Sequence, residues 1–302
     1  MQRAIEMVEV GPRDGLQNEA KLVLTADKVE LIRKCIAAGV TRIEVASFVN
    51  PRKVPQMADA EAVVEMLGPF PGVTRIGLVL NLRGAERALA AKVDQLGAVA
   101  VASDGFGVRN QGQNSAQSVT EAKAIIAMAK AGGRSAQVTI ATAFGCPFEG
   151  EIDPAHVVAM ARELAEAGPC EVALADTIGV AVPAQVTALV TAVREAIAPL
   201  PVRVHFHDTR NTAVANVWAA VEAGAVTVDA SLGGLGGCPF APGALGNVAT
   251  EDVAYLFARS GIATGLDPDR LLEASHWLAE IMGKALPSSL ARATPFPPQG
   301  LA

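Results

Sequence analysis

Eight short apolar runs alternate with longer helical patterns along the chain, and this alternation constrains the fold more than any other feature. The runs are continuously apolar, as expected for parallel strands that are covered on both faces. Helices between successive runs would supply that cover. Eight strand–helix units therefore predict an α/β fold, a (β/α)8 TIM barrel. The expected strands are 5–10, 40–46, 73–80, 97–102, 136–143, 170–175, 202–206 and 226–230.

The segments between the expected strands contain residues that favour helix starts and helix ends. Thr25 is expected to cap the first helix and Gly39 to follow its last turn. Pro154 and Pro183 occupy first-turn positions of later helices. A doubly wound open sheet is the alternative, but no glycine-rich phosphate fingerprint follows the first strand. The expected helices are 25–38, 56–67, 83–91, 118–131, 154–167, 183–197 and 211–223, followed by 250–260 and 267–284.

Length and composition narrow the possible partners. The 302 residues suit a single domain, with the barrel at about 1–260 and a C-terminal helical cap and tail at about 261–302. No apolar block approaches the roughly 20 residues of a membrane span, so no membrane partner is expected. The formal charge is −6 without a Lys/Arg cluster, which argues against nucleic-acid binding. A start without a signal peptide and four scattered cysteines predict a cytoplasmic location.

Polar residues stand directly after the expected strands. In a barrel these positions share the C-terminal face, where active sites are built. One such residue could be a cap or a turn former, but a set spread over every strand is hard to explain by structure alone. The set comprises Arg13, Asp14, Glu44, Ser47, Asn81, Ser103, Asp104, Thr142, Cys146, Asp176, His205, His207, Asp208, Cys238 and Asn247.

His205 and His207 give the most specific signal in this set. Residues two apart on a strand point to the same side, so the two imidazoles face one region. Taken alone, the pair fits two buried histidines as well as two metal ligands. Asp14 favours the metal, because strands one and seven flank strand eight in a closed barrel. Such a mixed N/O site suits Mg²⁺ or Mn²⁺, with Zn²⁺ or Co²⁺ possible in vitro.

A glycine-rich segment, Gly233–Phe240, holds the cysteine of most interest. Glycines let the backbone approach a ligand closely. A lone cysteine is more often inert packing, but Cys238 stands beside the expected cation, which would alter its proton affinity. Cys146 lies in the similar segment Gly145–Phe148 without such a neighbourhood, and we interpret it as structural or peripheral.

Arg13 and Asp176 each allow two interpretations. Arg13 is either a surface arginine paired with Glu9 or Glu44, or an electrophile aimed at developing negative charge. In the second case Glu44 would hold it in place. Asp176 either caps the start of a helix or anchors a metal-binding histidine, and we favour the anchor.

Several motifs resemble those of the 3-hydroxy-3-methylglutaryl-CoA lyase family, and together they cover nearly the whole chain. Isopropylmalate and homocitrate synthases and biotin carboxyltransferase domains share the barrel and the His-x-His pair. Their corresponding loop lacks Gly-Gly-Cys-Pro, so the loop favours a lyase over a synthase. The motifs are Val8–Glu19, Ile43–Phe48, Val54–Met57, Gly145–Gly150, Asp176–Gly179, Gly236–Ala241 and Gly246–Asp252.

The resemblance implies a single lyase domain that needs Mg²⁺ or Mn²⁺ and cleaves 3-hydroxy-3-methylglutaryl-CoA (HMG-CoA) by a retro-Claisen reaction. The products would be acetyl-CoA and acetoacetate, as in leucine degradation and ketone-body formation. The family also suggests a homodimer. The implied metal ligands are Asp14, His205, His207 and Asn247. The implied catalytic residues are Cys238 as the thiol, Arg13 at the thioester carbonyl, and His207 or Asp14 as the base. The expected substrate contacts are Arg13, Ser47 and Asn110.

Two departures from the family pattern leave the acyl group open. Arg210 and Asn211 stand where the family usually has an aromatic or aliphatic residue and then glycine, and Arg210 would add a charge near the site mouth. Asparagine tolerates the left-handed backbone that glycine often supplies. The loop 103–107 is also more glycine-rich than the usual acid-containing segment. The alternatives are a lyase for a larger 3-hydroxy-3-substituted glutaryl-CoA, a Claisen-condensing synthase, and a silent metal- or CoA-binding barrel.

Overall fold

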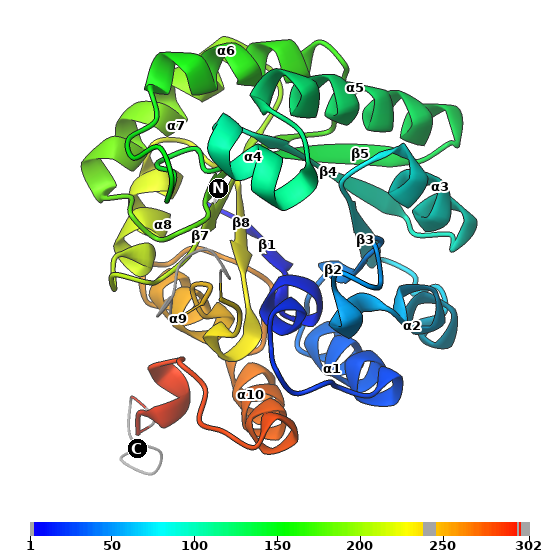
Figure 1. The fold of residues 1–302 in the computed structure, drawn as a ribbon. Coiled ribbons are helices and arrows are strands. Elements are labelled where there is room, and N and C mark those ends of the chain that lie inside the picture. The colour runs from blue at the N-terminus through cyan, green and yellow to red at the C-terminus, as the bar shows by residue number, and fades with distance from the viewer. Residues whose placement is uncertain (1–2, 238–245, 295, 297–302) are drawn as a thin grey trace.

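The computed structural model describes residues 3–237, 246–294 and 296. Eight parallel strands follow one another in sequence order around a closed barrel, and β1 pairs with β8 to close it. The predicted TIM barrel is confirmed (Figure 1). The strands are β1 (Glu6–Glu9), β2 (Arg42–Ser47), β3 (Thr74–Val79), β4 (Gln95–Val101), β5 (Ser135–Ala141), β6 (Val172–Asp176), β7 (Val202–Phe206) and β8 (Thr227–Ala230).

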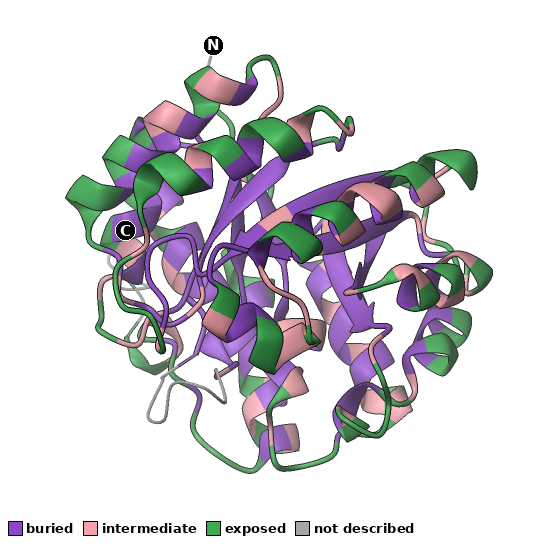
Figure 2. Ribbon diagram, turned by 45° about the horizontal axis from the view of Figure 1, so that its top comes forward, coloured by how far each residue is buried: buried purple, intermediate pink, exposed green. Residues whose placement is uncertain are grey.

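Helices surround the barrel and bury their apolar sides against it. Figure 2 shows buried strands inside and exposed residues along the outer faces of the helices. Pro154 and Pro183 open α6 and α7, as the sequence predicts. The helices are α1 (Thr25–Ala37), α2 (Ala60–Leu67), α3 (Leu82–Ala90), α4 (Asp104–Gln111), α5 (Ser115–Ala131), α6 (Pro154–Ala165), α7 (Pro183–Ile197), α8 (Ala213–Glu222), α9 (Thr250–Arg259) and α10 (Pro268–Met282).

Four short helical turns complete the described structure: η1 (Gly11–Gly15), η2 (Pro55–Met57), η3 (Leu232–Gly234) and η4 (Leu290–Arg292). The π-helical turn η1 follows β1, and the 3-10 turn η3 follows β8. Both turns therefore lie at the C-terminal face of the barrel, where the loops that follow the parallel strands begin. Among the described residues, no helix combines the length and apolar character that crossing a bilayer requires.

Several helix starts differ from the predictions, including α5, which begins at Ser115 and not at 118. Thr25 is the first residue of α1 rather than its cap, and its hydroxyl donates to Asp59 Oδ2 at 2.7 Å. The predicted helix 56–67 divides into η2 and α2. The Gln56 side chain binds the preceding loop, accepting from Val23 N at 3.0 Å and donating to the carbonyl of Lys21 at 2.9 Å. These contacts connect η2 to residues 21–23, the segment before α1.

The glycines near 105 are also misinterpreted from sequence, because the segment 103–107 opens helix α4 rather than forming a loop. A Cβ on Gly107 would lie 2.4 Å from the carbonyl oxygen of Gln113. The backbone N–H of Gly105 donates to the Glu149 carboxylate. Close approach to neighbouring segments, rather than flexibility, therefore accounts for glycine here.

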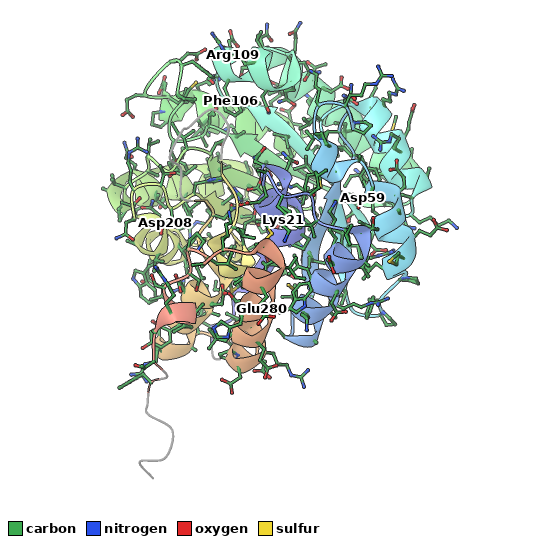
Figure 3. All side chains as sticks on the ribbon, turned by 60° about the horizontal axis from the view of Figure 1, so that its bottom comes forward. Lys21, Asp59, Phe106, Arg109, Asp208 and Glu280 are labelled. Atoms are coloured by element: carbon green, nitrogen blue, oxygen red, sulfur yellow. The ribbon has the colours of Figure 1, made fainter. Side chains whose placement is uncertain are left out.

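The C-terminal elements pack against the loops of the barrel face. Lys21, labelled in Figure 3, donates from Nζ to the carbonyl of Ile281 at the end of α10. Leu286 packs over Gly233, where a Cβ would meet its Cδ1 at 2.3 Å. Ser288 N donates to the carbonyl of Gly233 at 3.0 Å. The segment after α10 thus holds η3 in place.

Candidate metal and acyl-CoA site

Asp14, His205 and His207 meet at the C-terminal face, as the sequence predicts, with one ligand atom of each within 4.8 Å of the others. Asp14 Oδ2 lies 3.8 Å from His205 Nε2 and 3.6 Å from His207 Nε2. These separations exceed a hydrogen bond, so the three atoms converge without satisfying one another. His207 Nδ1 is buried and has no hydrogen-bond partner among the described residues. Two imidazoles and a carboxylate are a donor set that fits a divalent cation.

Asn247, which the family resemblance implies as a fourth ligand, also lies at this cluster. The backbone of 246–248 runs beside the end of β7. Asn247 and His207 form an isolated antiparallel β-bridge, and Val248 N donates to the carbonyl of Phe206 at 3.0 Å. Asn247 Nδ2 donates to Asp14 Oδ2 at 2.9 Å. Its amide would turn over to offer Oδ1 to a cation. A Cβ on Gly236 (φ +113°) would lie 2.4 Å from that Nδ2, so glycine is required there.

A carboxylate that the sequence analysis missed orients His205. Asp229, on β8, accepts from His205 Nδ1 at 3.2 Å, and the register pairs these two residues directly. The contact leaves Nε2 facing Asp14. Metal-binding histidines commonly carry such a carboxylate on the opposite nitrogen. An acidic residue inside an apolar strand, Thr227–Ala230, was the available signal.

Arg13 is held between two carboxylates beside the cluster. Its Nε donates to Glu44 Oε2 at 2.7 Å, and its Nη1 pairs with Asp14 Oδ1 at 2.5 Å. The Arg13 side chain is only 11% exposed, which excludes the surface-arginine interpretation. Glu9 does not contact it and instead accepts from backbone amides. The π-helical turn η1 therefore presents Arg13 and Asp14 together at the barrel mouth.

The electrostatics of the cluster keep Asp14 ionised. Burial raises the pKa of Asp14. Arg13 and the two imidazoles together lower this pKa by a larger amount, so it lies well below its usual value. Burial lowers the pKa of His205, but Asp229 and Asp14 outweigh this effect and raise it. A cation bound here would therefore compete with a proton on His205.

Two buried glutamates bind the backbone around η3. Glu9 Oε1 accepts from Leu232 N at 2.8 Å, and both Glu251 oxygens accept from Gly233 N at 3.0 Å. Burial raises the pKa of each carboxyl group from 4.5 to about 7. These residues fix the start of the glycine-rich segment relative to β1.

Replacing Glu9 with glutamine is expected to flatten the pH dependence of the unfolding free energy between about pH 4.5 and 7. With its pKa raised in the folded state, Glu9 binds more protons there than in the unfolded chain, so its contribution to stability falls as pH rises. The shift corresponds to about 3 kcal/mol. Gln Oε1 would keep the amide contacts, and its Nε2 would donate to Thr250. Urea unfolding at several pH values measures the slope.

The exposed Glu195 of α7 provides the matched control, and Glu195→Gln should leave that slope unchanged. A Glu9→Gln protein with the wild-type slope would contradict the assignment.

The other predicted site residues lie in different settings. Ser47 is buried at the end of β2, and its Oγ has no hydrogen-bond partner among the described residues. Asn110 is half-buried on α4. Asp176 accepts from Val180 N at 3.0 Å and Ala181 N at 2.9 Å, which lie in the loop before α7. The N-cap of α7 is Val182, so Asp176 caps a turn of this loop and not the helix start, and among the described residues no histidine side chain donates to it. Cys238 lies outside the described residues.

Arg210 and Asn211 stand at the turn after β7. Asn211 has φ +58°, the left-handed conformation expected of it. Arg210 Nη1 donates to the carbonyls of Ile178 at 3.2 Å and Gly179 at 2.8 Å. Arg210 thus ties the β7 turn to the loop after β6.

Some polar residues after the strands have structural contacts instead. Asn81 caps α3 by accepting from Gly84 N, and Asp208 accepts from Ala213 N at 2.8 Å. Cys146 is buried, and its sulfur accepts from Ser103 Oγ at 3.0 Å. The structural interpretation of Cys146 fits these contacts.

The chain is similar to known proteins in both sequence and structure. The HMGL-like family model matches residues 4–278. The (R)-citramalyl-CoA lyase of Chloroflexus aurantiacus is 43% identical over 98% of this chain and 96% of that protein. The 3-hydroxy-3-isohexenylglutaryl-CoA/hydroxymethylglutaryl-CoA lyase of Pseudomonas aeruginosa is 40% identical over 96% of this chain and 97% of that protein. An HMG-CoA lyase from Acinetobacter baumannii, solved with coenzyme A and 3-methylmalate, superposes with a TM-score of 0.93 at 39% identity, covering 99% of this chain and 97% of that one.

Proposed function

The chain belongs to the HMGL-like family and is a carbon–carbon lyase, and we propose that its substrate is HMG-CoA, cleaved to acetyl-CoA and acetoacetate. The observation that carries the proposal is the convergence of Asp14, His205 and His207, with Arg13 beside them, at the C-terminal face. The family depends on a metal, and we propose that Asp14, His205, His207 and Asn247 hold Mg²⁺ or Mn²⁺.

The reaction is a retro-Claisen cleavage. A divalent cation at this site supplies Lewis-acid chemistry toward the substrate's hydroxyl and carboxylate oxygens. His207 or Asp14 accepts the proton of the tertiary hydroxyl. As the carbon–carbon bond breaks, its electron pair passes to the thioester, forming an enolate whose oxygen accepts from the Arg13 guanidinium. Cys238 then gives its proton to the enolate carbon, which completes acetyl-CoA.

The surrounding residues support these roles. Glu44 fixes the Arg13 guanidinium through its 2.7 Å contact, so the guanidinium need not reorient during the reaction. Ser47 and Asn110 are proposed to bind the substrate, and the buried Ser47 Oγ has no hydrogen-bond partner among the described residues. The proposal further includes a homodimer in the cytoplasm and a place in leucine degradation or ketone-body formation.

(R)-Citramalyl-CoA is the second candidate substrate, because an enzyme named for it is 43% identical to this chain. That thioester carries its carboxylate directly on the carbinol carbon, whereas HMG-CoA has one methylene between them. The same cleavage would then give pyruvate in place of acetoacetate. One methylene in a pocket changes kcat/KM by about 10–200-fold, so one substrate should be clearly preferred.

The test is a kinetic comparison of the purified protein, with Mg²⁺ or Mn²⁺, on HMG-CoA, (R)-citramalyl-CoA and 3-hydroxy-3-isohexenylglutaryl-CoA. Acetyl-CoA and the keto acid product are measured by mass spectrometry. We expect HMG-CoA to have the highest kcat/KM. A higher value for either other thioester would reassign the substrate, and no acetyl-CoA from any of the three would contradict the proposed function.

A further inference from the structure

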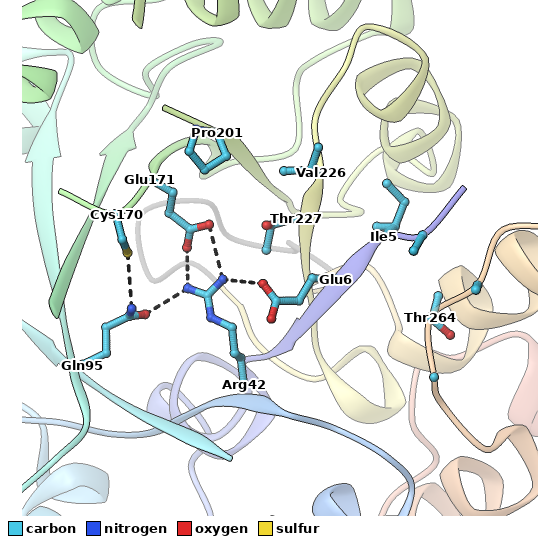
Figure 4. Close-up of a pocket in the computed structure, with 13 residues that line it drawn as sticks. Ile5, Glu6, Arg42, Gln95, Cys170, Glu171, Pro201, Val226, Thr227 and Thr264 are labelled. Carbon is cyan, nitrogen blue, oxygen red and sulfur yellow. Dashed lines mark hydrogen bonds and ion pairs between the residues drawn. The ribbon is translucent and has the colours of Figure 1, made fainter. Parts of the chain in front are cut away.

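Charged side chains of alternating sign form a column inside the barrel, below the candidate metal site. At the N-terminal mouth Arg42 pairs with Glu6 at 2.7 Å and with Glu171 at 2.5 Å (Figure 4). The pocket of about 740 Å³ at this mouth is lined by these same groups. Because they are already paired with one another, we assign the pocket no ligand.

Arg203 is the next member of the column and lies wholly inside the barrel, with its side chain 0% exposed. Its Nε lies 3.7 Å from Glu171 Oε1, and its Nη1 lies 3.5 Å from Asp229 Oδ1. Its Nη2 donates to Thr139 Oγ1 at 2.9 Å. A buried guanidinium needs such compensation, since an unpaired charge in the interior costs several kcal/mol.

Asp229 connects this arginine to the metal site. One carboxylate oxygen faces Arg203 and the other accepts from His205 Nδ1 at 3.2 Å. Arg203 and His205 are two residues apart on β7, so both side chains point into the barrel toward the same neighbour on β8. The Arg203–Asp229 contact is an ion pair without a hydrogen bond, so the guanidinium attracts the carboxylate electrostatically. The carboxylate in turn orients the imidazole through a hydrogen bond.

We propose that Arg203 is a positioning residue for the metal site: it holds the Asp229 carboxylate in the orientation that turns His205 Nε2 toward Asp14. The inference rests on the proposed function, because His205 is a ligand only if the cation binds there. A merely structural arginine would stabilise the barrel without changing the affinity for metal. A positioning arginine changes that affinity even in a fully folded protein.

The experiment measures Mn²⁺ binding calorimetrically to the purified, metal-stripped protein. Arg203→Met removes the guanidinium, Arg203→Lys keeps the charge, and Asp229→Asn removes the carboxylate at constant shape. Arg42→Met is the matched control, because Arg42 also pairs with Glu171 but, among the described residues, makes no hydrogen bond or ion pair with Asp229. Thermal melts of the metal-free proteins report folding.

We expect Arg203→Met and Asp229→Asn to raise the Kd for Mn²⁺ about 10–100-fold, the usual effect of losing a partner of a metal-binding histidine. Arg203→Lys should recover a large part of the loss, and Arg42→Met should stay within about threefold of wild type. A folded Arg203→Met protein with the wild-type Kd would overturn the inference. If Arg203→Met does not fold, an unchanged Kd in Asp229→Asn overturns it instead.

A second readout separates this inference from the proposed function. If the wild-type protein binds no Mn²⁺, the proposed function fails, and ¹⁵N spectra of the metal-free protein at alkaline pH then test Arg203. His205 should carry its proton on Nδ1 in wild type and in Arg42→Met, since Asp229 accepts from that nitrogen. Arg203→Met should lose this preference. An unchanged tautomer in Arg203→Met would overturn the role of Arg203.

Discussion

Replacing His207 with alanine is expected to lower kcat/KM for the acyl-CoA substrate at least about a thousandfold. Removing an imidazole from the Asp14–His205–His207 cluster weakens cation binding, and a catalytic cation contributes several kcal/mol to the transition state. Chelation of the wild-type protein should abolish turnover, and added Mg²⁺ or Mn²⁺ should restore it. Steady-state kinetics, together with metal content measured by mass spectrometry, check the prediction.

His156 provides the matched control. It is an exposed histidine on α6 whose Nε2 lies 3.3 Å from Ser115 Oγ, and it is not a member of the cluster. His156→Ala should keep nearly wild-type kinetics and metal content. Full activity in a rigorously metal-free wild-type preparation would show that turnover does not depend on a cation bound at the cluster.

Replacing Arg13 with methionine is expected to lower kcat about 10²–10³-fold while KM changes much less, because the guanidinium meets charge that develops only in the transition state. Arg13→Lys should recover part of the rate, since an ammonium keeps the charge but loses the planar fork that Glu44 holds. Initial-rate kinetics and thermal melts are measured side by side.

Arg75 is the matched control for a buried, paired arginine outside the site. It donates twice to Asp94, from Nε at 2.7 Å and Nη2 at 3.0 Å, on the opposite side of the strand from the barrel interior. Arg75→Met should melt at a lower temperature and turn over normally. If Arg13→Met behaves in the same way, Arg13 is structural, and the enolate must be stabilised by other groups.

The fold was predictable because the relevant signals are local. A strand buried on both faces is continuously apolar, and a helix beside it carries its own end signals, such as Pro154 and Pro183. Eight repeats of that pattern leave few topologies besides a barrel. Errors arose where a distant contact decides a helix start. Thr25 is such a case, because its hydroxyl donates to Asp59, 34 residues away.

The centre of the candidate site was predictable for a related reason. The two-residue period of a strand places His205 and His207 on one side, and barrel closure brings Asp14 beside them. The proximity of these three residues is confirmed, whereas their catalytic roles and that of Cys238 stay predictions. The single-domain organisation also stays a prediction.

The barrel and the face on which polar residues gather both follow from the periodicity of single elements, and the amino-acid order was enough to predict them. The contacts between individual polar groups became known only from the folded chain. Asp229 faces His205, Arg203 reaches both Asp229 and Glu171, and Asp176 caps a turn rather than holding a histidine. Such pairings depend on strand register and on side-chain reach across the closed barrel, which no local pattern encodes.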